Sequence, residues 1–202
     1  PQKFNYIDFS KEIISLPRKS ASLSKDRYIS EDFMKMEWEG IWTKTWLFAG
    51  IEADIKEIGD FFVYDIGRES IVITRDESEK ISAFYNVCQH RGNKIVTLES
   101  GSFNKISCPY HGWSYALDGK LEHVPDRELF EGGVPCDEKS LKPVRVSVWA
   151  GLIFINMNED SPSLETFLGP IIEQLKPYKF EKMNLVKHQT VDVLDTNWKT
   201  VR

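Results

Sequence analysis

The sequence CQHRG, residues 88–92, and the sequence CPYHGW, residues 108–113, each hold a cysteine and a histidine with one or two residues between them. The chain has three cysteines and four histidines, so their pairing in two separate stretches is informative. Thiolates and imidazoles are ligands that transition metals favour in proteins. We therefore predict one metal site built from two loops, with four ligands: Cys88, His90, Cys108 and His111.

The spacing of these ligands is Cys-x-His followed by Cys-x-x-His, with the 17 residues 91–107 between the pairs. This is the pattern of a Rieske [2Fe–2S] centre, in which two histidines replace two cysteines on one of the irons. Cys88 and Cys108 are then expected on one iron, and His90 and His111 on the other. A structural zinc module is the weaker alternative, because zinc sites usually pair cysteine with cysteine and histidine with histidine.

The residues around the predicted ligands suit a metal-binding loop. Gly92 and Gly112 follow the two histidines, where the backbone has to turn tightly and pass close to the metal group. Pro109 stiffens the second stretch, and backbone N–H groups in such turns can donate hydrogen bonds to a cluster. Arg91 and Trp113 flank the histidines and are candidates for the border of the exposed cluster edge.

The sequence NVCQHRG…CPYHGWSYALDGKL resembles the N-terminal Rieske domain of the Rieske non-heme iron oxygenases, which hydroxylate aromatic rings, in their large α subunit. The likeness extends to the tryptophan-rich helix near residue 40 and to NWK, residues 197–199, which resembles the start of that family's catalytic domain. Gln89 departs from the family, which often has arginine there. The loops also lack the extra cysteine pair of respiratory Rieske proteins, which implies the low-potential oxygenase or ferredoxin type.

This resemblance implies an oxidoreductase. Electrons would pass from a reductase or ferredoxin through the cluster to a mononuclear non-heme iron, for O₂-dependent hydroxylation of an organic substrate. It also implies trimers of the full-length subunit, with a cluster histidine facing a carboxylate of the neighbouring catalytic domain. The mononuclear iron site is expected only beyond this chain. A stand-alone Rieske-type ferredoxin, which carries electrons without being an enzyme, is the second reading.

Composition excludes some classes of protein. The net charge of −5 and the pI of about 5.5 argue against a nucleic-acid-binding face. The apolar runs are short, so we expect no membrane span. The first residues lack the apolar stretch of a signal peptide, so a cytoplasmic location is expected.

We predict a mainly β fold, an antiparallel Rieske domain with flanking helices. Residues 1–46 are expected to form an extended N-terminal arm to residue 29 and a helix capped by Ser30, with one apolar stripe running to Trp46. Residues 47–158 form the Rieske domain, and residues 159–202 begin a truncated catalytic domain. The expected strands are 47–51, 60–66, 70–75, 81–87, 144–149, 151–157 and 184–194.

Two further local predictions concern turns and helix starts. Asp118-Gly119 predicts a hairpin with a type I′ turn, in which both central residues have positive φ. Helical segments are expected to open at Ser161-Pro162 and to restart at Gly169-Pro170. The remaining candidates are read as bystanders: Cys136 as a free thiol, and His123 and His188 as surface or packing residues.

Overall fold

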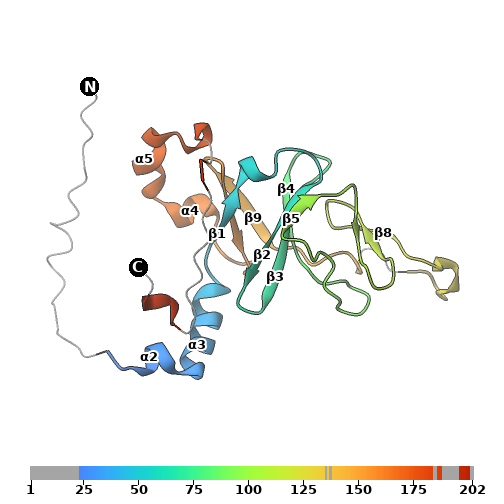
Figure 1. The fold of residues 1–202 in the computed structure, drawn as a ribbon, viewed down its shortest axis with the longest axis horizontal. Coiled ribbons are helices and arrows are strands. Elements are labelled where there is room, and N and C mark those ends of the chain that lie inside the picture. The colour runs from blue at the N-terminus through green and yellow to red at the C-terminus, as the bar shows by residue number, and fades with distance from the viewer. Residues whose placement is uncertain (1–22, 135, 137, 184–185, 188–195, 201–202) are drawn as a thin grey trace. The chain divides into compact units, whose positions relative to one another are not determined.

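The computed structural model describes residues 23–183, except 135 and 137, together with residues 186–187 and 196–200 (Figure 1). The chain divides into two compact units. One runs from Met36 to Asp192, and the other consists of the terminal segments up to Lys35 and from Val193. Among the described residues, no helix is long and apolar enough to cross a membrane.

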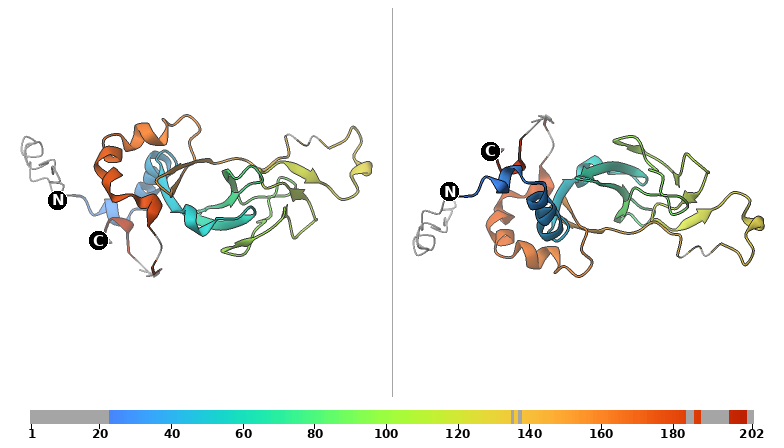
Figure 2. Two further views of the ribbon diagram at one scale, coloured as in Figure 1. Left: turned by 90° about the horizontal axis from the view of Figure 1, so that it is seen from above. Right: turned by 90° about the horizontal axis from the view of Figure 1, so that it is seen from below.

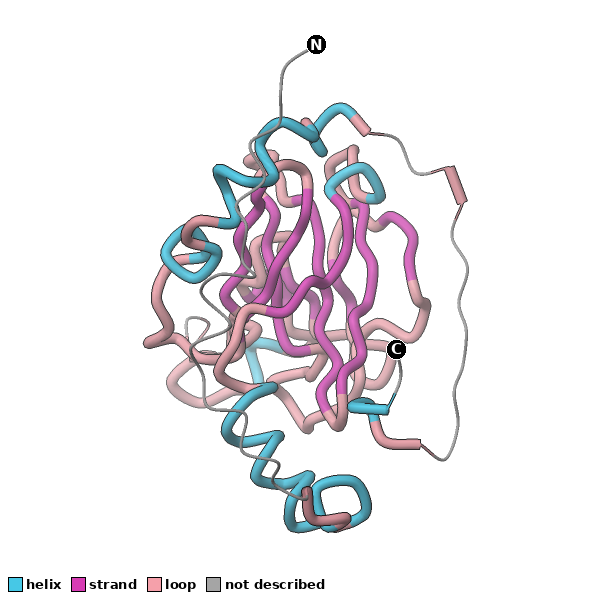
Figure 3. The backbone as a smooth tube through the Cα atoms, turned by 90° about the vertical axis from the view of Figure 1, so that its left-hand side faces the viewer, coloured by secondary structure: helices cyan, strands magenta, loops and turns pink. Residues whose placement is uncertain are grey.

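Two antiparallel sheets form the centre of the larger unit, as predicted, and Figure 3 shows their strands running alongside one another. One sheet has the order β1-β10-β9, made of Leu47–Ile51, Leu152–Asn156 and Arg145–Trp149. The other has the order β4-β3-β2-β5, made of Ile81–Tyr85, Glu69–Arg75, Asp60–Ile66 and Ser100–Ser102. The predicted strands between residues 47 and 157 are therefore confirmed, with ends that differ by one or two residues.

Strand β3 links two hydrophobic cores because its side chains alternate between the faces of the sheet. Ile71 and Ile73 are fully buried in a core shared with residues of β1 and β10, including Ile153 and Ile155. Val72, on the opposite face, packs into a second core that contains aromatic residues and two of the predicted ligands. The face of this sheet that carries Val72 thus packs against the core that contains the two predicted cysteine ligands.

A third, small sheet has the order β6-β7-β8, made of Ile106–Ser107, Ser114–Tyr115 and Leu121–His123. The hairpin between β7 and β8 confirms the turn predicted at Asp118-Gly119, but the type I′ assignment is wrong. Gly119 has a φ of 84°, whereas Asp118 is not among the described residues with positive φ. The Asp118 carboxylate instead accepts the Lys120 N–H at 3.1 Å, which favours a longer turn that ends on a left-handed glycine.

The helices near the N-terminus differ from the prediction in two respects: the end of the expected arm is helical, and the expected helix ends early. The expected extended arm lies mostly outside the described residues, but its end forms the short helix α2 (Asp26–Ile29). Helix α3 (Glu31–Glu37) begins as predicted, since Ser30 Oγ accepts the Phe33 N–H at 3.3 Å. The helix then widens into the π-helical turn η1 (Trp38–Trp42) and stops. The stripe expected to reach Trp46 on one helix is therefore wrong.

Trp46 follows the helix and is buried against α4 (Leu164–Leu168), with which it forms a small core. Its indole N–H donates to the Pro162 carbonyl at 3.0 Å. Helix α4 is capped by Ser163, two residues later than predicted, and α5 (Ile171–Leu175) restarts after Gly169-Pro170 as expected. The packing of Trp46 against α4 explains why the helical segment formed by α3 and η1 ends before Trp46.

The remaining helical segments are short turns: η2 (Glu52–Asp54), η3 (Arg127–Leu129), η4 (Lys176–Tyr178), η5 (Phe180–Lys182) and η6 (Trp198–Thr200). The strand predicted at residues 184–194 lies almost wholly outside the described residues, as does His188. The boundaries expected at residues 46 and 158 remain a prediction.

Candidate metal centre

Two loops of the larger unit carry the four predicted ligands. We call residues 88–93, which follow β4, the first ligand loop, and residues 108–113, which join β6 to β7, the second ligand loop. The small sheet that carries the second loop lies at the end of this unit remote from α4 and α5 (Figure 2).

Two backbone hydrogen bonds close the first ligand loop. The Cys88 N–H donates to the Asn93 carbonyl at 2.9 Å, and the Gly92 N–H donates to the Cys88 carbonyl at 2.9 Å. Gly92 has a φ of 73°, in the left-handed region that favours glycine. The space around it would admit a Cβ, so the backbone conformation is what calls for glycine here.

The second ligand loop repeats this bonding. The Cys108 N–H donates to the Trp113 carbonyl at 2.8 Å, and the Gly112 N–H donates to the Cys108 carbonyl at 3.1 Å. Gly112 has a φ of 71°, close to that of its counterpart. The two cysteines therefore occupy equivalent positions in matching turns. The histidines do not, since His90 is two residues after its cysteine and His111 is three.

The fold brings the four predicted ligands together as two pairs. Cys88 and Cys108 are buried in one core, at 2% and 4% exposure. The ring centroids of His90 and His111 lie 4.7 Å apart. Trp113 stacks on His90 with an interplanar angle of 5° and a centroid distance of 4.8 Å. The donors thus form a thiol pair and an imidazole pair.

The imidazole pair opens onto the surface. His90 and His111 line one side of a depression of about 380 Å³, together with Trp113. The segment from Pro125 to Phe130 forms the rest of the wall. One edge of the candidate site is therefore accessible, whereas Cys88 and Cys108 are only 2% and 4% exposed.

The His90 ring shows that the site suits a metal. Its Nδ1 atom is buried and has no hydrogen-bond partner within the described part of the chain. A buried polar atom without a partner costs about 1–3 kcal/mol, which coordination to iron would offset. In the same part of the chain, no group of three or more His, Cys, Asp or Glu side chains is placed to hold one metal ion. The donor set and the unpaired nitrogen fit the two irons of a Rieske cluster, which share the four ligands in pairs.

The electrostatics of His90 favour the neutral ring that binds metal. Burial lowers the pKa of its imidazole, and the positive charges of His111, Arg91 and Lys139 lower it further. Arg91 itself is exposed within the first ligand loop, and its place at the cluster edge stays a prediction.

Burial also favours the neutral form of Cys88, which for a thiol opposes metal binding. Burial raises the pKa of the Cys88 thiol, and hydrogen bonding with Cys108 adds to this increase. Hydrogen bonds with the Tyr115 hydroxyl and the His90 backbone act in the other direction. A bound iron would favour both thiolates and reverse the balance.

Two residues that sequence reasoning missed lie beside the ligands. Tyr115 is fully buried, with its hydroxyl 3.3 Å from the Cys88 sulfur. Asn86, two residues before Cys88, is 1% exposed and hydrogen-bonded through its whole side chain. A buried tyrosine hydroxyl or asparagine amide requires partners, which is the signal that could have drawn attention to both.

The bystander residues lie outside the ligand group. Cys136 is partly buried, and its sulfur accepts a hydrogen bond of 3.3 Å from Arg127. His123 is exposed at the end of β8.

Residues 45–136 match the Rieske [2Fe–2S] domain family. The chain carries a Rieske domain. It is 34% identical over 187 residues to the glycine betaine monooxygenase oxygenase subunit of Pseudomonas aeruginosa, covering 90% of this chain and 42% of that protein. It is 32% identical to the biphenyl dioxygenase α subunit of Paraburkholderia xenovorans, covering 85% of this chain and 40% of that protein. The Rieske domain is thus homologous to those of Rieske oxygenase α subunits.

Solved structures agree with this family. The quaternary ammonium Rieske monooxygenase CntA superposes with a TM-score of 0.73 at 32% identity, covering 77% of this chain and 45% of that one. A naphthalene 1,2-dioxygenase superposes with a TM-score of 0.69 at 31% identity, covering 73% and 33%. The present chain spans about two fifths of the length of the curated relatives that it matches.

Proposed function

We propose that Cys88 and Cys108 hold one iron of the cluster and that His90 and His111 hold the other. The observation that supports this proposal is that the two cysteines share one core and the two histidine rings lie 4.7 Å apart, with the Nδ1 atom of His90 buried and unpaired. When bound, a Rieske cluster supplies reversible one-electron transfer. The function proposed for this domain is electron transfer within an oxygenase α subunit.

The cysteine side and the histidine side of the site are proposed to have different roles. Cys88 and Cys108 are buried among apolar side chains, which limit the access of water to the thiolate side. His90 and His111 border the surface depression, so the imidazole side is the route by which electrons enter and leave. Trp113 packs flat against His90 and holds that ring in place.

The partners follow from the family. We propose a reductase or ferredoxin as electron donor, and a mononuclear non-heme iron in a catalytic domain as acceptor, for O₂-dependent hydroxylation. The full-length subunit is proposed to form trimers, and residues 159–202 to begin its catalytic domain. The relatives include enzymes named for quaternary ammonium substrates and for aromatic substrates at similar identity, so the electron-transfer step is the part common to both.

The α-subunit reading is favoured over a stand-alone ferredoxin by the extent of the match. The Rieske family covers residues 45–136, whereas the glycine betaine monooxygenase subunit aligns with 90% of the chain. Helices α4 and α5 lie outside the Rieske match. A ferredoxin needs neither helix.

The test is a potentiometric titration of the purified red-brown protein, followed by visible absorption. We expect one reversible one-electron step, and we expect His90→Ala or His111→Ala to abolish the colour. His123→Ala, which removes an exposed histidine of the same domain, should keep the step unchanged. A colourless protein, or a chromophore that survives His90→Ala, would contradict the proposed ligand set.

A further inference from the structure

The two ligand loops share their internal bonding but differ at their bases. The second loop is closed by two pairs of facing strand residues, Ser107 with Ser114 and Ile106 with Tyr115. The first loop has one backbone bridge, between Val87 and Lys94. Strand β4 ends at Tyr85, and the returning residues 95 and 96 belong to no strand.

The side chain of Asn86 takes the place of the missing strand pairs. Its Oδ1 atom accepts the backbone N–H groups of Ile95 at 3.1 Å and Val96 at 2.8 Å. Its Nδ2 atom donates to the Val96 carbonyl at 2.8 Å and to Ser70 Oγ at 3.2 Å. The backbone N–H of Asn86 donates to the Ser70 carbonyl at 2.8 Å, which anchors the residue to the sheet.

These contacts use all four hydrogen-bonding positions of the carboxamide: two acceptor lone pairs and two N–H donors. Asn86 is 1% exposed, so water cannot replace a lost partner. One side chain therefore closes the base of the first loop, where the second loop has a backbone ladder.

We propose that Asn86 is the positioning residue that keeps Cys88 and His90 in place, where each supplies one ligand to a different iron of the cluster. The inference rests on the ligand set proposed above. Without the carboxamide, three buried backbone groups of Ile95 and Val96 lose their partner. The first loop then opens locally more often than the rest of the fold, as segments with few supporting contacts do. The cluster is lost through this loop, while Cys108 and His111 remain in place.

The experiment compares Asn86→Ala with Asn156→Ala in the iron-loaded chain. Asn156 is a matched control, because it is also 1% exposed but lies at the end of β10, in the other sheet. The measurement is the rate at which visible absorption bleaches under anaerobic EDTA, set against the unfolding midpoint of the same sample. Asn86→Asp is the milder variant, since it keeps acceptors for the two N–H groups but loses both donors.

We expect Asn86→Ala to bleach at least about ten-fold faster than the unchanged chain at temperatures where both are folded. Asn86→Asp should lie between them, and Asn156→Ala should bleach at the unchanged rate even if its unfolding midpoint falls. Equal bleaching of Asn86→Ala and Asn156→Ala would overturn the inference. So would failure of both Asn86 variants to fold, because Asn86 would then support the whole fold. If the unchanged chain binds no iron and sulfide, the proposed ligand set fails instead.

Discussion

The hydroxyl group of Tyr115 lies 3.3 Å from the Cys88 sulfur and accepts the Gln89 N–H at 3.1 Å. Since the Gln89 N–H can only donate, the Tyr115 proton is free to point at the sulfur, and a metal-bound thiolate can only accept it. A donor hydrogen bond stabilises the reduced cluster more than the oxidised one, because reduction adds negative charge.

Tyr115→Phe should therefore lower the reduction potential of the cluster. The expected decrease is on the order of 40 mV, equivalent to about 1 kcal/mol for one electron. Potentiometry with visible detection measures it. Tyr64→Phe is the matched control, since Tyr64 packs in the other core and should leave the potential unchanged. An unchanged or higher potential in Tyr115→Phe would refute the donor role.

Two glycines with similar backbone conformations should respond differently to substitution. Gly119 has a φ of 84°, and a Cβ there would lie 2.5 Å from the buried ring of Phe84. Gly133 has a φ of 81°, with nothing within 4 Å of an added Cβ. Gly133→Ala should cost only the left-handed backbone strain, about 1–2 kcal/mol of unfolding free energy. Gly119→Ala should cost about 3 kcal/mol or more, because overpacking adds to the strain.

Denaturant unfolding of the two variants checks this difference. Equal losses for Gly119→Ala and Gly133→Ala would show that the Phe84 ring yields to the new methyl group.

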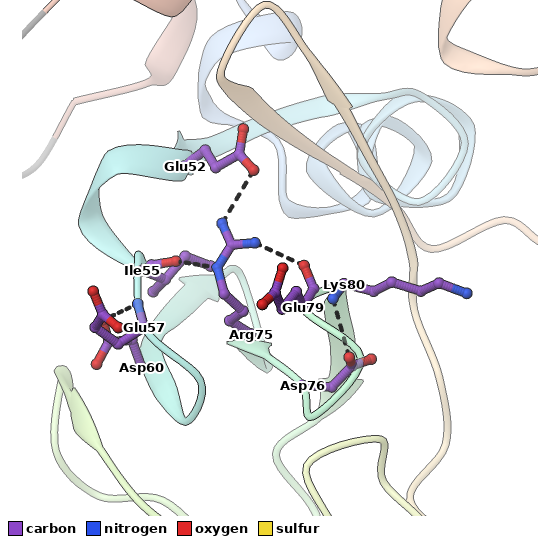
Figure 4. Close-up of polar contacts among 8 residues, drawn as sticks. All are labelled: Glu52, Ile55, Glu57, Asp60, Arg75, Asp76, Glu79 and Lys80. Carbon is purple, nitrogen blue, oxygen red and sulfur yellow. Dashed lines mark hydrogen bonds and ion pairs between the residues drawn. The ribbon is translucent and has the colours of Figure 1, made fainter.

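Arg75, the last residue of β3, makes three contacts at one end of the four-stranded sheet (Figure 4). Its guanidinium donates to the Ile55 carbonyl at 2.7 Å, to the Glu79 carbonyl at 2.7 Å and to Glu52 Oε1 at 3.0 Å. Only 12% of its side chain is exposed. Arg75→Ala should lower the free energy of unfolding by about 2–4 kcal/mol, because two backbone carbonyls lose a charged donor.

Lys176→Ala is the control for that prediction. Lys176 pairs with Glu173 at 3.7 Å, and both side chains are more than 70% exposed. Such surface pairs contribute about 0–1 kcal/mol. Thermal unfolding in low and high salt measures both variants. A loss for Arg75→Ala that disappears in salt would mean that screened charge, not buried hydrogen bonding, accounts for it.

Asp118 should contribute a small pH dependence to stability. Burial alone would raise the pKa of its carboxyl group, but hydrogen bonds from the Lys120 side chain and backbone N–H outweigh burial and lower it. A lowered folded-state pKa stabilises the fold above the unfolded value of about 3.9, and this contribution is lost as pH falls through the folded value. The side chain is 38% exposed, so the effect should stay below about 1 kcal/mol.

Asp118→Asn should therefore lower stability near pH 6 but converge with the unchanged chain in acid, below about pH 4. Urea unfolding across this range measures the convergence. A stability gap that is constant with pH would show that the carboxylate charge plays no part.

The local patterns predicted more of this fold than the long-range contacts did. Strands such as Leu47–Ile51 and Asp60–Ile66 follow from alternation and β-branched residues, which are local signals. The four candidate ligands follow from spacing alone. The prediction that Trp46 continues the apolar face of the helix was wrong. Trp46 packs instead against α4, more than a hundred residues away in the chain, and this contact overrides the helical period.

The supporting residues of the site needed the structure for the same reason. The hydroxyl of Tyr115 meets a sulfur 27 residues earlier in the chain, and Asn86 bonds residues that lie 9, 10 and 16 positions away. Neither relationship leaves a periodic signal. The turn at Asp118-Gly119 was located correctly, but its type depended on a side-chain hydrogen bond that the dipeptide alone does not specify.

The most direct test of the central claim is to count iron, acid-labile sulfide and nitrogen ligands in one sample of the chain. Chemical assay should find about two irons and two sulfides per chain. Electron–nuclear double resonance of the dithionite-reduced protein should detect two imidazole nitrogens, and the whole signal should disappear with the cluster in His90→Ala. A single zinc ion without sulfide, or a cluster that shows no nitrogen coupling, would contradict the account.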